Sequence, residues 1–122
     1  MSNGESHRPR VLVVEDDSDI ASLLSEILEN EGYAAVAVSD HDDLKGELDP
    51  RPDLIVLDLR LTRGSADQIL QTVRARGLGD VPVVLLSAAG DLAERADELG
   101  VSAYVAKPFE LEELLLVVRR FV

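Results

Sequence analysis

Short apolar runs alternate with amphipathic stretches along the chain from residue 10 onward. The apolar runs, rich in valine, leucine, isoleucine and alanine, lie at 11–14, 33–38, 54–57, 81–86 and 101–105. Continuous runs of this length are typical of strands buried on both faces. Between them, apolar residues recur every three or four positions at 18–30, 41–48, 66–76, 91–99 and 110–121. This spacing predicts five helices, one after each strand.

Residues suited to helix ends lie where the pattern places those ends. Ser18 or Asp19 is expected to cap the first helix, while Gly32, Gly77 and Gly100 follow the first, third and fourth helices. Strands that alternate with helices through short loops form right-handed βαβ units around a parallel sheet. The sequence therefore predicts an α/β fold, with a polar leader at 1–9 and a single domain at 10–122.

The composition narrows the classes of function. The 122 residues include no cysteine, which excludes disulfides, thiolate metal sites and a cysteine nucleophile. The formal net charge of -12 repels phosphate backbones, so we expect no nucleic-acid binding by this domain alone. No apolar run approaches the roughly 20 residues of a membrane span, and the amino terminus lacks the apolar segment of a secretory signal. We therefore expect no membrane partner and a cytoplasmic location.

Chemically active side chains follow four of the five predicted strands. They are three adjacent acids, a further acid, a hydroxyl and an amine, in the order Glu15, Asp16, Asp17, Asp58, Ser87 and Lys107. Taken singly, each is typical of a solvated loop, a helix cap or a turn. Because the carboxyl ends of parallel strands meet at one edge of the sheet, where ligands bind, we expect the set to lie together.

This set has the chemistry that phosphoryl transfer requires. Clustered carboxylates repel one another unless a cation or a proton lies among them, and an all-oxygen site of few carboxylates suits Mg2+. The Asp58 carboxylate can attack phosphorus and form an acyl phosphate. Lys107 and the Ser87 hydroxyl can then neutralise the phosphoryl oxygens.

The order and spacing of these residues resemble those of response-regulator receiver domains. The matching segments are Val13-Val14-Glu15-Asp16, Leu57-Asp58, Leu86-Ser87-Ala88 and Tyr104-Val105-Ala106-Lys107-Pro108-Phe109. The resemblance extends from residue 11 to about residue 122. It implies a flavodoxin-like (βα)5 sandwich of three layers, with strand order 2-1-3-4-5 and helices on both faces. It also implies a two-component signalling protein rather than an enzyme, although one that promotes its own Mg2+-dependent phosphotransfer and dephosphorylation.

The resemblance further implies roles for individual residues. Asp58 would take the phosphoryl group from a histidine of a sensor kinase or a histidine phosphotransfer protein. Mg2+, or Mn2+ in its place, would be held by Asp16, Asp58 and the backbone carbonyl of Arg60, with Glu15 acting through water. Lys107 would then move towards the phosphoryl group.

Two more expectations follow from the resemblance. Ser87 and Tyr104 would form the switch, with Tyr104 rotating inward as Ser87 approaches the phosphoryl group, although Tyr104 is also consistent with a half-buried aromatic at the sheet edge. The Lys107–Pro108 peptide bond would be cis.

The resemblance places the output of the domain on the face formed by the fourth helix, fifth strand and fifth helix. In the fifth helix, the residues expected to face inward are Leu111, Leu114, Leu115 and Val118. Leu116 and Val117 fall off that stripe, which indicates either deeper burial or a phosphorylation-dependent docking or dimer surface for an effector or a second copy.

The sequence departs from the family pattern near the acceptor. Receivers commonly carry proline four residues and glycine eight residues after the acceptor, whereas Thr62 and Ala66 occupy those positions here. Gly64 could supply the bend instead, so metal affinity and the entry to the next helix are in question. Arg60 and Ala89 occupy places that tune phosphoryl lifetime in the family, with a combined effect of undetermined sign.

Two other functions compete with the phosphoacceptor interpretation. The segment from Asp58 to Thr62 resembles the Asp-x-Asp-x-Thr motif of haloacid-dehalogenase-like phosphatases, but Arg60 replaces the general acid and cannot give up a proton. Alternatively, the chain is a receiver-shaped interaction module that works without phosphorylation. The sequence names neither the kinase nor the output, and it is consistent with both a stand-alone regulator and a piece of a longer protein.

Overall fold

Strands and helices alternate along the chain as the apolar pattern predicts. The computed structural model describes residues 8–58, 66–87 and 92–122. The strands are β1 (Arg10–Val14), β2 (Ala34–Val38), β3 (Leu54–Asp58), β4 (Val83–Ser87) and β5 (Ala103–Ala106). The helices are α1 (Ser18–Asn30), α2 (His41–Gly46), α3 (Ala66–Ala75), α4 (Leu92–Leu99) and α5 (Leu111–Arg119). None of the described helices has the length and apolar character needed to cross a bilayer.

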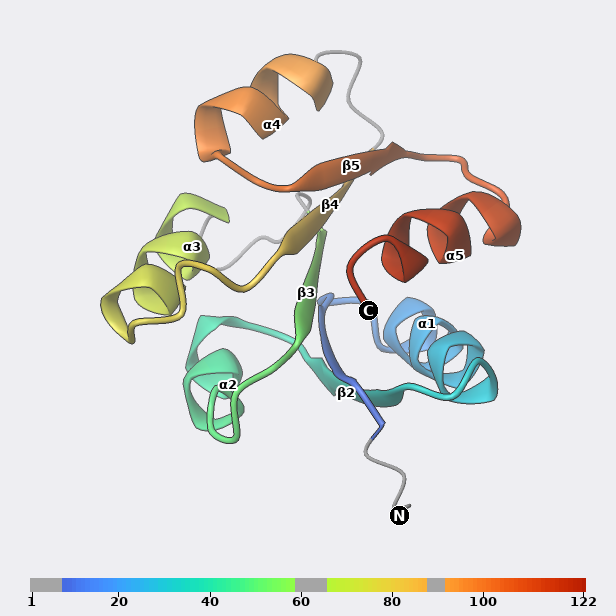
Figure 1. The fold of residues 1–122 in the computed structure, drawn as a ribbon, viewed down its shortest axis with the longest axis horizontal. Helices are drawn as coiled ribbons and strands as arrows, with labels where there is room; N and C mark the ends of the chain where they lie inside the picture. The colour runs from blue at the N-terminus through green and yellow to red at the C-terminus, as the bar shows by residue number, and fades with distance from the viewer. Residues whose placement is uncertain (1–7, 59–65, 88–91) are drawn as a thin grey trace.

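The five strands form one parallel sheet between two layers of helices. Their order is β2-β1-β3-β4-β5, and each neighbouring pair is parallel. In Figure 1, α1 and α5 cover one face of the sheet, and α2, α3 and α4 cover the other. The expected flavodoxin-like order is therefore confirmed. The chain changes direction across the sheet between β1 and β3, and such a switch point opens a crevice at the carboxyl ends of the strands.

Strand residues alternate between two hydrophobic clusters, one on each face of the sheet. In β1, Leu12 and Val14 join the cluster that packs against α2, α3 and α4. Val11 and Val13 point to the opposite face and pack with residues of α1 and α5. This two-residue period explains why the central strands carry apolar residues towards both faces of the sheet, and it fixes the register of the residues at the strand ends.

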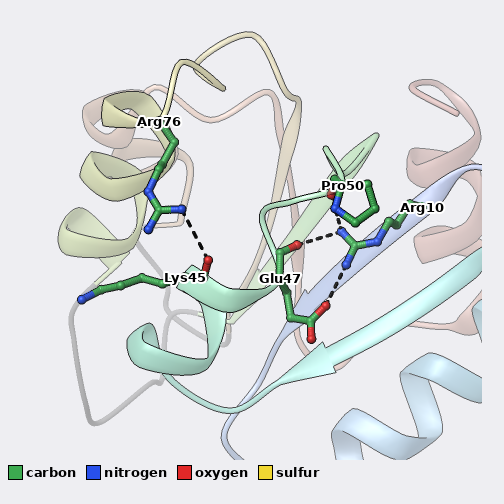
Figure 2. A network of polar contacts seen from close by, with 5 residues as sticks. All are labelled: Arg10, Lys45, Glu47, Pro50 and Arg76. Carbon is green, nitrogen blue, oxygen red and sulfur yellow. Dashed lines mark hydrogen bonds and ion pairs between the residues drawn. The ribbon is translucent and has the colours of Figure 1, made fainter.

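At the amino-terminal edge of the sheet, Arg10 holds the segment between α2 and β3. Its guanidinium donates to the carbonyls of Glu47 and Pro50, at 2.8 and 2.9 Å, and to Glu47 Oε1 at 2.8 Å. Figure 2 shows this cluster beside the separate contact of Arg76, whose guanidinium reaches the Lys45 carbonyl at 3.4 Å. The cluster satisfies carbonyls that follow the end of a short helix.

The structure corrects two expectations about helix residues. Asp17, rather than Ser18 or Asp19, caps α1, because its side chain accepts from the backbone N–H groups of Asp19 and Ile20. Leu111 was expected to face inward and instead is 44% exposed. It is the first residue of α5, and helical side chains lean towards the preceding turn, so its side chain lies beyond the covered part of the helix.

Candidate functional site

The third strand carries Asp58 into a buried position at the carboxyl edge of the sheet. All five residues of β3 are buried, and Asp58, the last of them, is 1% exposed. In the described part of the chain, the buried polar and charged residues are Glu15, Asp58 and Ser87. Each lies at the end of a strand or directly after one. Burial of polar groups is costly, so their concentration at one edge indicates a site rather than core packing.

Lys107 supplies the positive charge of this edge. Its ammonium Nζ lies 2.6 Å from Asp58 Oδ2. Its backbone N–H donates to the Ser87 carbonyl at 2.8 Å, next to the point where Ser87 pairs with Ala106. The peptide bond between Lys107 and Pro108 is cis. Lys107 is therefore bonded to Asp58 through its side chain and to the end of β4 through its backbone.

Glu15 is the second buried carboxylate of the site and is 1% exposed. Oε2 accepts a hydrogen bond from the Asp17 N–H at 3.1 Å, whereas Oε1 has no hydrogen-bond partner among the described residues. Burial, together with the neighbouring Asp58 carboxyl group, raises the pKa of Glu15 to about 7, against smaller opposing effects of the Asp17 N–H and Lys107. The two carboxylates thus share one low-dielectric space in which negative charge is only partly compensated.

This donor set fits a hard divalent cation. Two adjacent buried carboxylates, one with an unpartnered oxygen, provide the oxygen ligands and the excess negative charge that Mg2+ prefers. The third predicted ligand, Asp16, follows Glu15 but is exposed. Within the described ranges, no group of three or more His, Cys, Asp or Glu residues is arranged to hold a metal ion. The structure therefore brings Glu15 and Asp58 together and leaves Asp16 outside their immediate cluster.

The structure describes some of the other residues named from the sequence and leaves others outside the described ranges. Tyr104 is 46% exposed in β5, while Ser87 is buried at the end of β4. Ala66 is buried as the first residue of α3. The predicted carbonyl ligand at Arg60, the departure at Thr62, the bend at Gly64 and the small residue at Ala89 fall outside the described residues.

Asp17 contributes to the site through its backbone N–H, a role that the sequence pattern did not reveal. Its side chain caps α1, and its backbone N–H holds the Glu15 carboxylate. The sequence pattern placed Asp17 among the acids that follow the first strand. A backbone donor leaves no trace in residue type, so the contact of the Asp17 N–H with Glu15 could not be predicted. The acidic triplet directly before a helix was the one available signal.

Comparison with known families supports the same identification. Residues 11–119 match the family described as response regulator receiver domain. The phosphate regulon transcriptional regulatory protein PhoB of Escherichia coli is 37% identical over 110 residues, which cover 87% of this chain and 48% of that protein. The transcriptional regulatory protein PrrA of Mycobacterium bovis is 39% identical over 114 residues, covering 91% of this chain and 48% of that protein. The chain thus spans about half the length of these curated relatives.

Solved structures agree in fold. The receiver domain of NtrX from Brucella abortus superposes with a TM-score of 0.80 and 31% identity, covering 90% of this chain and 95% of that one. The chemotaxis protein CheY4 of Vibrio cholerae superposes with a TM-score of 0.85 at 22% identity, covering 95% of this chain and all of that one, and supports the fold alone. The family match covers nearly the whole chain, and the relatives are more than a third identical over most of it. This chain therefore belongs to the response regulator receiver domains of two-component signalling.

Proposed function

We propose that this chain is a phosphoacceptor domain in which Asp58 receives a phosphoryl group from a histidine of a sensor kinase or a histidine phosphotransfer protein. The observation that carries the proposal is the position of Asp58, which is buried beside Glu15 and 2.6 Å from the Lys107 ammonium. This contact orients the Asp58 carboxylate, and the Lys107 ammonium lies beside the carboxylate that would gain a phosphoryl group. The cysteine-free composition suits the cytoplasm, where we place the reaction.

The chemistry requires one bond to form and one to break. An Asp58 carboxylate oxygen attacks the phosphorus of a phosphohistidine, the O–P bond forms, and the P–N bond breaks with its electron pair left on the imidazole nitrogen. Lys107 exchanges its partner from the carboxylate to a phosphoryl oxygen, and the Ser87 hydroxyl donates to another. Later attack by water on phosphorus releases Asp58 and inorganic phosphate. The chain thus carries the phosphoryl group on Asp58 and returns to its free form on hydrolysis. We class it as a signalling protein and not as an enzyme.

Glu15, Asp16 and Asp58, with the Arg60 carbonyl, would hold Mg2+, or Mn2+ in its place. When bound, the ion neutralises part of the charge that gathers on the phosphoryl group. In this assignment Glu15 acts through water, and Asp16 turns inward from its exposed position. The protein's own part is to keep Glu15 and Asp58 buried and adjacent, and to keep Lys107 within reach of both.

The output surface is the face of α4, β5 and α5. An open groove of about 430 Å³ lies there, lined among others by Asp97, Tyr104 and Arg120. Tyr104 and Leu116 add exposed apolar area, at 46% and 60%. Because the Lys107 backbone bonds to Ser87 at the end of β4, a change of partner at the Lys107 ammonium is coupled to the strands beneath this face. An effector or a second copy of the chain would bind there after phosphorylation.

Intact-mass measurement tests the assignment. The purified chain is incubated with acetyl phosphate, with and without Mg2+, beside an Asp58→Asn variant. We expect a Mg2+-dependent gain of one phosphoryl group that the variant lacks. A folded chain that gains nothing under any condition would instead be an interaction module that works without phosphorylation. The Thr62 and Ala66 departures would then be the first positions to restore to proline and glycine.

A further inference from the structure

The outer strand β2 lies at one edge of the sheet (Figure 1). None of its side chains is charged. Its five residues are Ala-Ala-Val-Ala-Val. Edge strands present rows of unpaired backbone groups, and natural proteins protect them with charged side chains, proline or bulges. An apolar edge without proline is therefore a template for pairing with another strand unless a neighbouring element protects it.

The backbone groups that face outward can be assigned from the ladder. The Ala34 N–H donates to the Pro9 carbonyl, and the Val38 carbonyl accepts from the Glu15 N–H, so both residues face β1. Because the bonding direction alternates along a strand, Ala35 and Ala37 direct their N–H and C=O groups away from the sheet. These two residues are the points at which an added strand would bond.

Glu29, near the end of α1, covers the first of these points. Its Oε2 accepts from the Ala35 N–H at 2.9 Å, and its Oε1 lies 3.0 Å from the Arg8 guanidinium. Arg8 also reaches the Tyr33 carbonyl at 3.5 Å, so the arginine holds the carboxylate over the start of β2. The Ala35 N–H and Arg8 together lower the pKa of Glu29, so the carboxylate remains charged across the physiological range.

We propose that Glu29 guards the β2 edge against pairing with the β2 edge of a second copy of this chain. A second copy fits because two β2 edges related by a two-fold axis present the same outward groups to each other in antiparallel register. Pairing would require removal of a charged carboxylate from its donor and its solvent, a cost that an uncharged edge does not carry. This inference does not depend on phosphorylation of Asp58.

The experiment compares self-association of three variants by light scattering after size-exclusion chromatography. Glu29→Ala should associate at least about tenfold more tightly than the unmodified chain, the factor for losing one charge-assisted bond. Glu31→Ala is the matched control. It removes the same charge two residues further along the chain, where the Glu31 carboxylate pairs with Arg119 instead of covering β2. Glu29→Ala with Ala37→Pro should return to the monomer, because proline at an outward-facing edge position removes a donor and blocks pairing.

Amide exchange in the unmodified chain tests the guard without any substitution. The Ala35 N–H should exchange more slowly than the Ala37 N–H, although both point away from the sheet. Equal exchange at the two amides would overturn the proposal. So would a folded Glu29→Ala chain that stays as monomeric as Glu31→Ala, or association of Glu29→Ala that persists when Ala37→Pro is added.

Discussion

The Lys107 ammonium lies 2.6 Å from Asp58 Oδ2, at an edge of the sheet that also buries the Glu15 carboxylate. Among the described residues, one cation thus faces two carboxylates that have almost no access to water. Within the described ranges the edge is therefore short of positive charge, and this shortage makes it suited to a metal ion and to a reaction in which negative charge arrives on phosphorus.

Removal of the Lys107 charge should destabilise the fold as well as the reaction. Lys107→Met leaves two buried carboxylates without their cation, and breaking a mostly buried pair in this way should cost about 2 kcal/mol or more in unfolding free energy. Urea denaturation in the presence of a chelator measures the loss. Arg119→Met is the control, because the Arg119–Glu31 pair is largely exposed and should be worth less than about 1 kcal/mol. Equal losses for the two variants would contradict a buried pair at the site.

The buried charge of Glu15 predicts a stability that depends on pH. The folded chain holds the Glu15 proton more tightly than the unfolded chain, because the folded-state pKa of about 7 exceeds the ordinary 4.5. The cost of burying the charged Glu15 therefore lowers the unfolding free energy by its full amount above about pH 7, and this cost disappears below about pH 4.5. In metal-free protein, Glu15→Gln should raise the unfolding free energy by about 2 to 3 kcal/mol at alkaline pH.

The gain from Glu15→Gln should vanish as the pH falls. Near about pH 5 the unmodified chain carries the proton on Glu15, so the variant offers little further advantage. Thermal melts across this range, with a chelator present, provide the measurement. Glu26→Gln, at an exposed position on α1, is the control for the loss of one negative charge. If the difference in unfolding free energy between the variant and the unmodified chain were the same at every pH, the fold would not disfavour the charged form of Glu15.

The fold could be predicted from the sequence because its signals are local and repeated. The central strands β3 and β4 are apolar at every position before the last, since both faces of the sheet are covered, and each helix shows a three-to-four-residue period. Boundaries were less certain, because a cap depends on which side chain reaches the free N–H groups. Asp17 does so for α1, although Ser18 and Asp19 have suitable side chains too.

The site was predictable in its residue types and not in its burial. The spacing of Asp58, Ser87 and Lys107 after successive strands was enough to place them at one edge. That Glu15 would be 1% exposed, with one unpartnered oxygen, could not be read from an acidic triplet, which is equally typical of a solvated loop. The Glu15 carboxylate meets the Asp17 backbone N–H and Asp58, and its contact with Asp58 arises only after the chain has folded.

Leu116, an exposed leucine of α5, should matter for association and not for stability. Leu116 is 60% exposed on the proposed output face, so Leu116→Lys should change the unfolding free energy by less than about 0.5 kcal/mol. In chains loaded with beryllium fluoride, an acyl-phosphate mimic, the substitution should abolish any self-association that loading induces. Sedimentation velocity with and without loading measures this. Leu23→Lys, at an equally exposed leucine of α1 that is 56% exposed, is the matched control.

If loading induces association that Leu116→Lys leaves intact, the output surface lies elsewhere. Loss of association in both leucine variants would indicate a general effect of added charge on a chain whose net charge is -12. Loss in Leu116→Lys alone would support the face of α4, β5 and α5. The three outcomes can be separated because both variants add the same charge at a comparable exposure.

The Arg10 cluster should contribute to stability without affecting the acceptor. Arg10 begins β1 at the amino-terminal edge of the parallel sheet, and Asp58 ends β3 at the opposite edge. Arg10→Met removes the donor to the carbonyls of Glu47 and Pro50 and breaks the pair with the Glu47 carboxylate. We expect a loss of about 1 to 3 kcal/mol in unfolding free energy, the range for carbonyls and a carboxylate left without a partly buried donor.

Arg76→Met provides the comparison, because the Arg76 guanidinium makes a long contact of 3.4 Å to the Lys45 carbonyl in the same region (Figure 2). Its loss should stay within about 0.5 kcal/mol. Both variants should take up one phosphoryl group from acetyl phosphate at the rate of the unmodified chain, measured at a temperature where each is folded. A slower rate in folded Arg10→Met would mean that the two edges of the sheet are coupled through β1, and the acceptor geometry could then no longer be attributed to the carboxyl edge alone.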